Sequence, residues 1–344
     1  MPLDEPGWWY ARQGHVVGAV LAPLGLLYGA IARRRFEQSA PFRSRLPVIC
    51  IGNFVAGGTG KTPLTLYLAR VLAAQGHRPV ALTRGYGARL KGPYWVDAAR
   101  DGGGDVGDEA LLLAGCLPTL LARDRAAGAK AIETGPHPAS VILMDDGMQN
   151  GSLAKDLVIA VVDGRRGFGN GRVIPAGPLR APLAFQMHQA DVILVNEPAG
   201  SDGAIAESLR REFTGAVLRA STTPTGDMAW LGEAPILAWA GIGGPERFFN
   251  LLASLGADVR IRRRFRDHHP LSDREAAELL QAAQASGTRL VTTSKDLARL
   301  KGRGGAAAEL ARESRVLEVG LTFPPGDADR LDEIVRSALA ARRT

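Results

Sequence analysis

One glycine-rich segment limits what this chain can fold into more than any other feature of its sequence. The segment GGTGKT at residues 57–62 follows an apolar run at 46–51 and precedes a stretch, 62–74, with apolar residues at helical spacing. A strand, a glycine-rich turn and a helix in this order are typical of a phosphate-binding loop, in which backbone N–H groups and the helix N-terminus face phosphate oxygens. The predicted nucleotide-binding residues are Gly57, Gly58, Thr59, Gly60, Lys61 and Thr62.

Within this loop, Lys61 is predicted to contact the β- and γ-phosphates and Thr62 to ligate Mg²⁺. Pro63 suits the first helical turn because its missing N–H would have no partner there. The strict loop pattern has glycine where this chain has Val55, and the nearest upstream glycine is Gly52. A merely tight strand-to-helix turn is the alternative, but it does not explain the lysine and threonine.

A second signal is an apolar run at residues 141–144 that ends in Asp145 and Asp146. Phosphate-loop proteins bring a carboxylate to Mg²⁺ from the end of a neighbouring strand, and Gln149 follows closely enough to position a metal-bound water. An acidic pair after a strand can instead cap a helix or lie in a solvated turn. The phosphate loop favours the metal site.

The fold class follows from apolar strands that alternate with helices. Further strands are expected at 79–83, 157–162, 192–195, 235–240 and 289–293, with helices at 109–115, 245–255 and 328–341. Such a pattern predicts an α/β protein of the P-loop NTPase type, with a mostly parallel sheet covered on both faces and a second, smaller α/β lobe. The chain has 344 residues, enough for two lobes. The expected units are an N-terminal helix (1–35), a kinase lobe (36–225) and a C-terminal lobe (226–344).

Three further clusters carry polar chemistry: RGYG at 84–87, Gly107-Asp108-Glu109, and DHHP at 267–270. Phosphoryl transfer to an alcohol needs a carboxylate, or a carboxylate and a histidine, to accept the hydroxyl proton. Helix-start acids and a loop hydrogen bond are the plainer interpretations of the second and third clusters. A glycine- and arginine-rich connection, 163–180, is a candidate for binding a phosphorylated acceptor through Arg180, or else a solvated loop.

The N-terminal segment 16–32 is uncharged, and Arg33, Arg34 and Arg35 follow it. Its length as a helix, roughly 26 Å, is slightly less than the hydrocarbon core of a bilayer, and Pro23 interrupts it. An interfacial position is therefore favoured over a spanning one. A signal peptide and an ordinary core helix are the alternatives.

Charge and cysteine content narrow the class of partner. The net charge of +7 suits phosphates or an anionic membrane, whereas the aromatic content of 6% and the lack of a basic–aromatic ladder argue against nucleic acid. Cys50 and Cys116 lie in apolar runs and are expected to be buried thiols.

Taken in order, the motifs resemble one family, the tetraacyldisaccharide 4'-kinases of lipid A biosynthesis in Gram-negative bacteria. The resemblance rests on segments from about residue 9 to residue 296: GNFVAGGTGKTP (52–63), TRGYG (83–87), VGDEALLLA (106–114), DDGMQ (145–149), VVDGRRGFGNG with PAGPLR (161–180), AGIGGPERFF (240–249) and RDHHP (266–270). Asn150 stands where members of the family often have histidine, so it is given no role.

The resemblance implies ATP- and Mg²⁺-dependent phosphorylation of the 4'-hydroxyl of a tetraacyl glucosamine disaccharide 1-phosphate, at the cytoplasmic face of the bacterial inner membrane. It implies that Asp108 is the base, assisted by His268, and that Lys61 and Thr62 serve the nucleotide and Mg²⁺. Further functional positions that it implies are Glu109, Asp145, Asp146 and Gln149 around the metal, and Tyr86, Arg125 and Arg180 toward the substrate.

Overall fold

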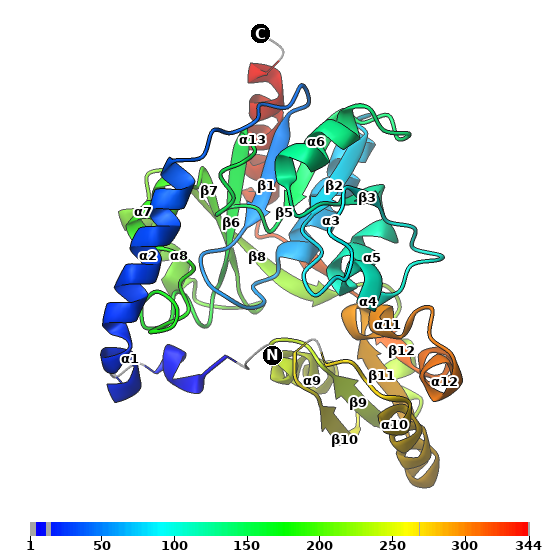
Figure 1. Cartoon of the computed structure of the whole chain (residues 1–344). Coiled ribbons are helices and arrows are strands. Elements are labelled where there is room, and N and C mark those ends of the chain that lie inside the picture. Colours follow the sequence, from blue (N-terminus) through cyan, green and yellow to red (C-terminus); the bar gives the residue numbers. More distant parts are fainter. Residues whose placement is uncertain (1–4, 12–14, 268, 343–344) are drawn as a thin grey trace.

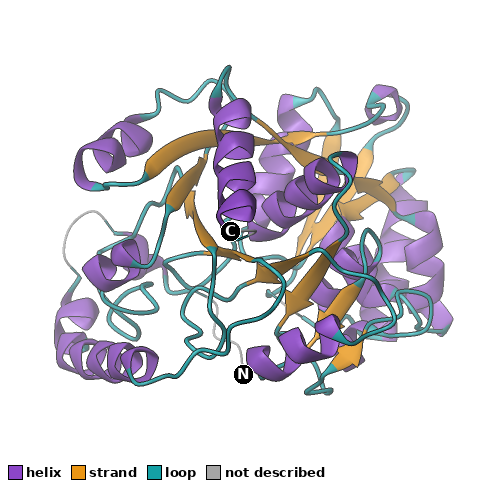
Figure 2. Cartoon of the chain, turned by 90° about the horizontal axis from the view of Figure 1, so that it is seen from above, coloured by secondary structure: helices purple, strands orange, loops and turns teal. Residues whose placement is uncertain are grey.

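The computed structural model describes residues 5–11, 15–267 and 269–342 of the chain. Its strands form a nine-stranded and a four-stranded sheet, and helices cover both (Figures 1 and 2). The predicted fold, a mostly parallel α/β sheet of the P-loop type with a second, smaller α/β lobe, is confirmed.

The nine-stranded sheet is built from buried apolar runs. Its strands, in spatial order, are β13 (Val319–Thr322), β8 (Ala216–Pro224), β7 (Val192–Asn196), β6 (Leu157–Asp163), β1 (Val48–Gly52), β5 (Val141–Asp145), β2 (Pro79–Thr83), β4 (Thr119–Leu121) and β3 (Tyr94–Trp95). Only the two edge pairs, β13 with β8 and β3 with β4, are antiparallel. Strands β1, β2, β5 and β6 are buried at every position, which explains why they read as unbroken apolar runs.

Helices pack on both faces of this sheet. One face carries α3 (Lys61–Ala74), α5 (Asp108–Ala114) and α13 (Asp327–Ala341), and the other carries α6 (Arg125–Glu133), α7 (Leu183–His188) and α8 (Ala204–Glu212). The short helix α4 (Gly103–Val106) leads directly into α5. Each face thus has its own apolar core, as a doubly covered parallel sheet requires.

The smaller lobe repeats the same design with a parallel sheet in the order β10 (Val259–Arg264), β9 (Ile236–Ala240), β11 (Arg289–Thr293) and β12 (Arg315–Leu317). The short helix η2 (Ala229–Gly232) precedes β9. Helix α9 (Pro245–Ser254) belongs to one core, and α10 (Asp273–Ser286), α11 (Ser294–Leu300) and α12 (Gly305–Glu313) to the other. Helix α10 begins at a capping box in which Ser272 and Glu275 bind each other's backbone N–H.

The chain returns to the large sheet after the smaller lobe. Strand β13 pairs with β8, and α13 packs against the large sheet, although residues 226–344 are expected in one unit. The division of the chain at residues 35 and 225 stays a prediction.

The N-terminal apolar segment forms η1 (Gly7–Tyr10), α1 (Val16–Val20) and α2 (Ala22–Glu37), with Pro23 in the first turn of α2. Glycines face the protein: a Cβ built on Gly25 would lie 2.6 Å from Val173 O, and one on Gly29 would lie 3.3 Å from Pro182. The large side chains Val16, Val20, Leu24, Leu26 and Leu27 are exposed. No helix of the described residues has the length and apolarity to cross a membrane.

The two cysteines differ from each other. Cys50 is buried in β1, as expected, and burial raises the pKa of its thiol to about 11. The expectation of burial is wrong for Cys116, which is exposed in the turn after α5. The apolar residues beside it in the sequence point into the core, while its own side chain does not.

Candidate active site

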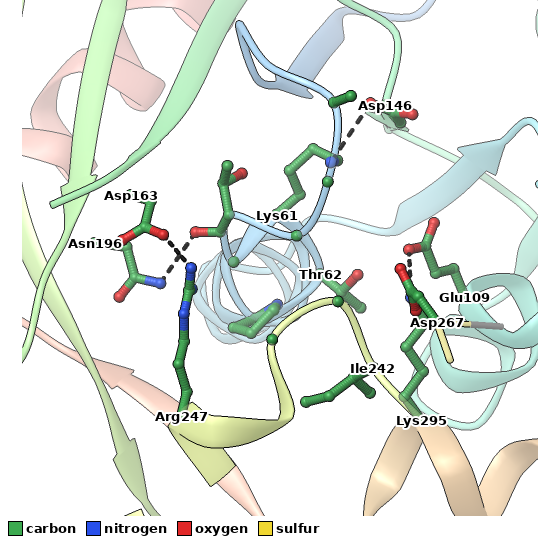
Figure 3. A pocket seen from close by; sticks show the side chains of 18 of the residues that line it. Lys61, Thr62, Glu109, Asp146, Asp163, Asn196, Ile242, Arg247, Asp267 and Lys295 are labelled. Carbon is green, nitrogen blue, oxygen red and sulfur yellow. Dashed lines mark hydrogen bonds and ion pairs between the residues drawn. The ribbon is translucent and has the colours of Figure 1, made fainter. Parts of the chain in front are cut away.

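The phosphate-binding loop lies between the carboxyl end of β1 and the start of α3. Gly57 and Gly60 adopt φ angles of 100° and 103°, which lie in the left-handed region and favour glycine. Lys61 is only 8% exposed and points along the loop toward Asp146, with 3.6 Å between its Nζ and Asp146 Oδ1 (Figure 3). The lysine is thus held over the space that the loop encloses.

Two asparagines hold this loop from outside. Asn53 Nδ2 donates to Gly57 O at 3.2 Å, and Asn196 Nδ2 donates to Thr59 O at 3.1 Å. Asn196 stands at the end of β7, in turn fixed by the Thr222 hydroxyl, which donates to its Oδ1 at 3.0 Å. Both of these hydrogen bonds come from the large lobe.

The departure from the strict loop pattern has a structural reason. Val55 is buried and forms an isolated antiparallel bridge with Leu179, and its carbonyl accepts from Arg180 Nε at 3.0 Å. A glycine there would leave this apolar contact empty. The bridge attaches the segment that carries Arg180 to the phosphate loop.

The acidic pair lies next to the loop, because β5 pairs with β1 so that Ile51 is opposite Asp145. Asp145 is fully buried, and Thr65 Oγ1 donates to its Oδ1 at 3.2 Å. Burial, together with the charge of Glu109, raises the pKa of Asp145 to about 7. Its other oxygen, Oδ2, has no hydrogen-bond partner among the described residues.

Asp146 follows in a left-handed conformation, with φ 52°, that turns its side chain toward two cations. Arg180 Nη1 donates to Asp146 Oδ1 at 2.7 Å, and Lys61 lies on the same oxygen. Burial alone would raise the pKa of Asp146, but these two cations outweigh it and hold the pKa well below its ordinary value. Asp146 is therefore a fixed anion between the loop and the arginine.

The smaller lobe forms the opposite wall of the cleft, which has a volume of about 2140 Å³. Figure 3 shows an ion pair between the lobes on each side of the loop: Asp163 with Arg247, and Glu109 with Lys295 at 3.1 Å. Burial would raise the pKa of Glu109, but Lys295 and then Lys61 outweigh it and lower that pKa. The phosphate loop thus faces charged groups from both lobes.

A carboxylate from the N-terminal segment also reaches the loop. A Cβ at Gly57 would collide with the Glu5 carboxylate, which Arg166 Nη1 binds at 2.8 Å. Burial, more than any charge, raises the pKa of Glu5. An anion therefore lies at the cradle that a phosphate is predicted to enter.

The residues predicted to contact the substrate all line the cleft but differ in how exposed they are. Tyr86 is 53% exposed and lines the cleft, as does Arg180. Arg125 lines it too, but is 2% exposed, and its Nη1 donates to Ala122 O at 2.5 Å. Burial lowers the pKa of Arg125 to about 10.

Gln149, predicted at the metal, donates from its amide nitrogen to Asn53 O at 2.8 Å and to Gln186 Oε1 at 2.7 Å.

Of the two residues predicted to accept the hydroxyl proton, Asp108 and His268, the structure describes only Asp108. Asp108, the first residue of α5, is 8% exposed and binds Arg299 Nε through Oδ2 at 2.5 Å. It does not line the cleft, whereas its neighbour Glu109 does. His268 lies outside the described residues.

Magnesium fits the residues that are present. Among the described residues, no three His, Cys, Asp or Glu side chains are grouped to hold a metal by themselves. Mg²⁺ in nucleotide sites is commonly held by one or two carboxylates together with the substrate phosphates, so a full protein cage is not needed. Thr62, which lines the cleft, and Asp145, whose Oδ2 has no hydrogen-bond partner among the described residues, offer the oxygen ligands that this arrangement requires.

Among the site residues that the sequence did not predict are Asn196, Arg247, Lys295 and Arg299. Asn196 directly follows the predicted strand 192–195, so its position at the carboxyl edge of the sheet was a usable signal. The other three come from the smaller lobe. Each of them has an acidic partner in the large lobe, and only the packing of the lobes brings the two together.

Comparison with known proteins decides the family. The family model of tetraacyldisaccharide-1-P 4'-kinase matches residues 17–340. The chain belongs to this family.

Individual relatives agree over almost the whole chain. It is 46% identical over 342 residues to the tetraacyldisaccharide 4'-kinase of Rhodopseudomonas palustris (strain BisB18), covering 99% of this chain and 97% of the relative. It is 48% identical over 308 residues to that of Nitrobacter winogradskyi, covering 89% and 90%. The crystal structure of LpxK from Aquifex aeolicus in complex with ATP superposes with a TM-score of 0.74 at 24% identity, over 94% of this chain and 100% of that one. The family is one of kinases, and the protein is a phosphotransferase.

Proposed function

We propose that this kinase transfers the γ-phosphoryl group of ATP to the 4'-hydroxyl of tetraacyldisaccharide 1-phosphate. A bond forms between the 4'-oxygen and the γ-phosphorus, the bond to the β-phosphate oxygen breaks, and ADP leaves. The observation that carries the proposal is the ordered phosphate loop, in which Lys61 lies 3.6 Å from Asp146 at the floor of a cleft between two lobes. Membership of the family names the acceptor.

On the nucleotide side, the loop amides of residues 57–60 and the Lys61 ammonium would bind the β- and γ-phosphates. Thr62 and Asp145 would hold Mg²⁺, with Glu109 and Gln149 as further candidates. When bound, Mg²⁺ neutralises charge that develops on the transferred group and its leaving oxygen. Asp146 keeps Lys61 and Arg180 in place, since both cations share one of its oxygens.

On the acceptor side, Asp108 with His268 would take the proton from the 4'-hydroxyl. Arg180, Tyr86 and Arg125 would contact the sugar or its phosphate. Arg180 is held at the loop by Asp146 and Val55 O, while its side chain stays 24% exposed.

The acyl chains would stay in or at the membrane. Helices α1 and α2 turn small glycines inward and large apolar side chains outward, the reverse of a core helix. Tyr28 and Phe36 of α2 also line the cleft that contains the phosphate loop. Helix α2 thus borders the cleft and also carries exposed apolar side chains. A position at the cytoplasmic face of the inner membrane, with α2 in the interface and Mg²⁺-ATP supplied from the cytoplasm, agrees with this arrangement. No role for nucleic acid is expected.

The test is a transfer assay with γ-labelled ATP and tetraacyldisaccharide 1-phosphate in detergent or vesicles. We expect the label on the lipid, in a linkage at the 4'-position. Release of all label as free phosphate would favour a nucleotide-switched ATPase, and label on a soluble sugar alcohol added in parallel would favour a small-molecule kinase. Omission of Mg²⁺ is expected to abolish transfer.

A further inference from the structure

Helix α11 of the smaller lobe brings a group of charged residues to the start of α5 in the large lobe. It contacts both α4 and α5 (Figure 1). Lys295 pairs with Glu109, and Arg299, one turn further along α11, pairs with Asp108. Two consecutive acids of the large lobe are therefore held by two cations of the smaller lobe, and only the first of these pairs lies in the cleft wall.

Arg299 is the centre of this contact. Its Nε donates to Asp108 Oδ2 at 2.5 Å, and its Nη1 donates to Asp296 Oδ1 at 2.6 Å and to Gly241 O at 2.5 Å. Asp267 Oδ1 lies 3.7 Å from its Nη2. The side chain is 9% exposed, and its contacts with Asp296, Gly241 O and Asp267 all lie within the smaller lobe.

We infer that Arg299 is a positioning residue that sets the orientation of the Asp108 carboxylate for transfer, an inference that rests on the proposed function. Asp108 follows Gly107, whose φ of 85° turns the chain sharply, and it begins a helix of only seven residues. In the large lobe this carboxylate therefore stands at the first position of a single short helix. The planar fork of Arg299, anchored on Asp296 and Gly241 O, adds support from the smaller lobe.

The same guanidinium contacts carboxylates of both lobes. Asp108 belongs to the large lobe, and Asp267 immediately precedes His268 in the smaller lobe. Arg299 reaches both carboxylates. This link between Asp108 and the smaller lobe exists only when the lobes are together, so the proposed alignment of Asp108 depends on contact between the lobes.

A purely structural role is the competing explanation, because breaking a buried ion pair destabilises a protein whatever its function. The two explanations differ in one respect. If Arg299 only positions Asp108, its substitution should not lower kcat further once Asp108 is inactive. If Arg299 has a structural role, its substitution should lower kcat in D108N as well. A double-mutant cycle on turnover separates them.

The experiment compares R299A, R299Q and R299K with wild type in the lipid transfer assay, together with D108N and D108N/R299Q. R303A is the matched control, since Arg303 follows α11 and binds only Leu271 O and Asp273, within the smaller lobe, among its contacts in the described residues. The kcat, the KM for ATP and the midpoint of thermal unfolding are measured for each variant. R299Q and R299K carry the test if R299A does not fold.

We expect kcat to fall by about tenfold to a hundredfold in R299A and R299Q, with the KM for ATP changed by less than about threefold. R299K should recover part of the loss, and D108N/R299Q should be no slower than D108N. A wild-type kcat in R299Q, or losses that multiply in the double variant, would overturn the inference while leaving the proposed function intact. No transfer by wild type would overturn the proposed function, and the inference with it.

Discussion

The two walls of the cleft are held in different ways. The phosphate loop is fixed within the large lobe, by hydrogen bonds from Asn53 and Asn196 and by the bridge at Val55. The acidic wall, formed by Glu109 at the start of α5, is fixed across the lobes by Lys295, and Arg299 holds the neighbouring Asp108, which does not itself line the cleft. The phosphate loop, here called the nucleotide wall, is therefore preorganised, whereas the acidic wall and the neighbouring Asp108, which we propose to serve the acceptor, are held only where the lobes meet. Nucleotide binding and phosphoryl transfer should then respond to different substitutions.

The largest effect is expected at the lysine of the phosphate loop. Lys61→Ala removes the cation over the predicted phosphate site, so we expect kcat to fall by about a hundredfold to a thousandfold. The labelled-ATP transfer assay measures this, with circular dichroism to establish that the variant is folded. Turnover near that of wild type, with lipid and Mg²⁺ saturating, would remove the basis for assigning the phosphate loop.

A change at Asp108, next to the acidic wall, should separate transfer from binding. Asp108→Asn keeps the shape of the side chain but not its basicity, and we expect kcat to fall by roughly a hundredfold or more. Nucleotide affinity, followed by titration with a fluorescent ATP analogue, should stay near the wild-type value. A loss confined to affinity would instead place Asp108 at the metal.

The opposite pattern is expected on the nucleotide wall. Asn196→Ala removes the donor that holds Thr59 O, so the KM for ATP should rise by about five- to thirtyfold, equivalent to about 1–2 kcal/mol. The kcat with saturating ATP should change less. Thr222→Val, which removes only the hydroxyl that fixes Asn196, is the matched variant and should give a smaller change in the same direction. Unchanged KM in both would contradict a preorganised loop.

The smallest effect concerns the anion that already lies at the loop. Glu5→Gln removes a negative charge beside Gly57, and nucleotide affinity should improve by about two- to fivefold, as expected for a partly exposed charge. Glu37→Gln is the control, because Glu37 is an exposed acid of the same N-terminal region that pairs with Arg33. Weaker nucleotide binding by Glu5→Gln would mean that the carboxylate supports the loop rather than competing with phosphate.

The same contrast explains what was predictable from the sequence. The loop, Lys61, Thr62 and the pair Asp145 and Asp146 follow from local patterns, because strand ends in a parallel sheet meet at one edge. Arg247, Lys295 and Arg299 depend on how two lobes pack, and no local pattern encodes that packing. Strand β8 was missed because it lies in a stretch that reads as a polar boundary, although its inner side chains are buried.

The N-terminal segment shows a different limit. Almost every residue from 16 to 32 is apolar, so the periodicity that normally tells an inner from an outer face is absent. What decides the face here is size: Gly18, Gly25 and Gly29 allow the helices to lie close against the segment 173–182. A pattern of small residues, not of apolar ones, was the informative signal.

The close packing of these helices on the segment 173–182 has a practical consequence for any shortened form of the protein. The segment 173–182, on which the helix lies, includes Arg180 and, through it, touches Asp146. A chain that begins after residue 37 would lack α1 and α2, so the segment 173–182 would lose the helices that pack against it. A shortened enzyme should therefore turn over slowly even when its acceptor is dispersed in detergent and no membrane needs to be reached.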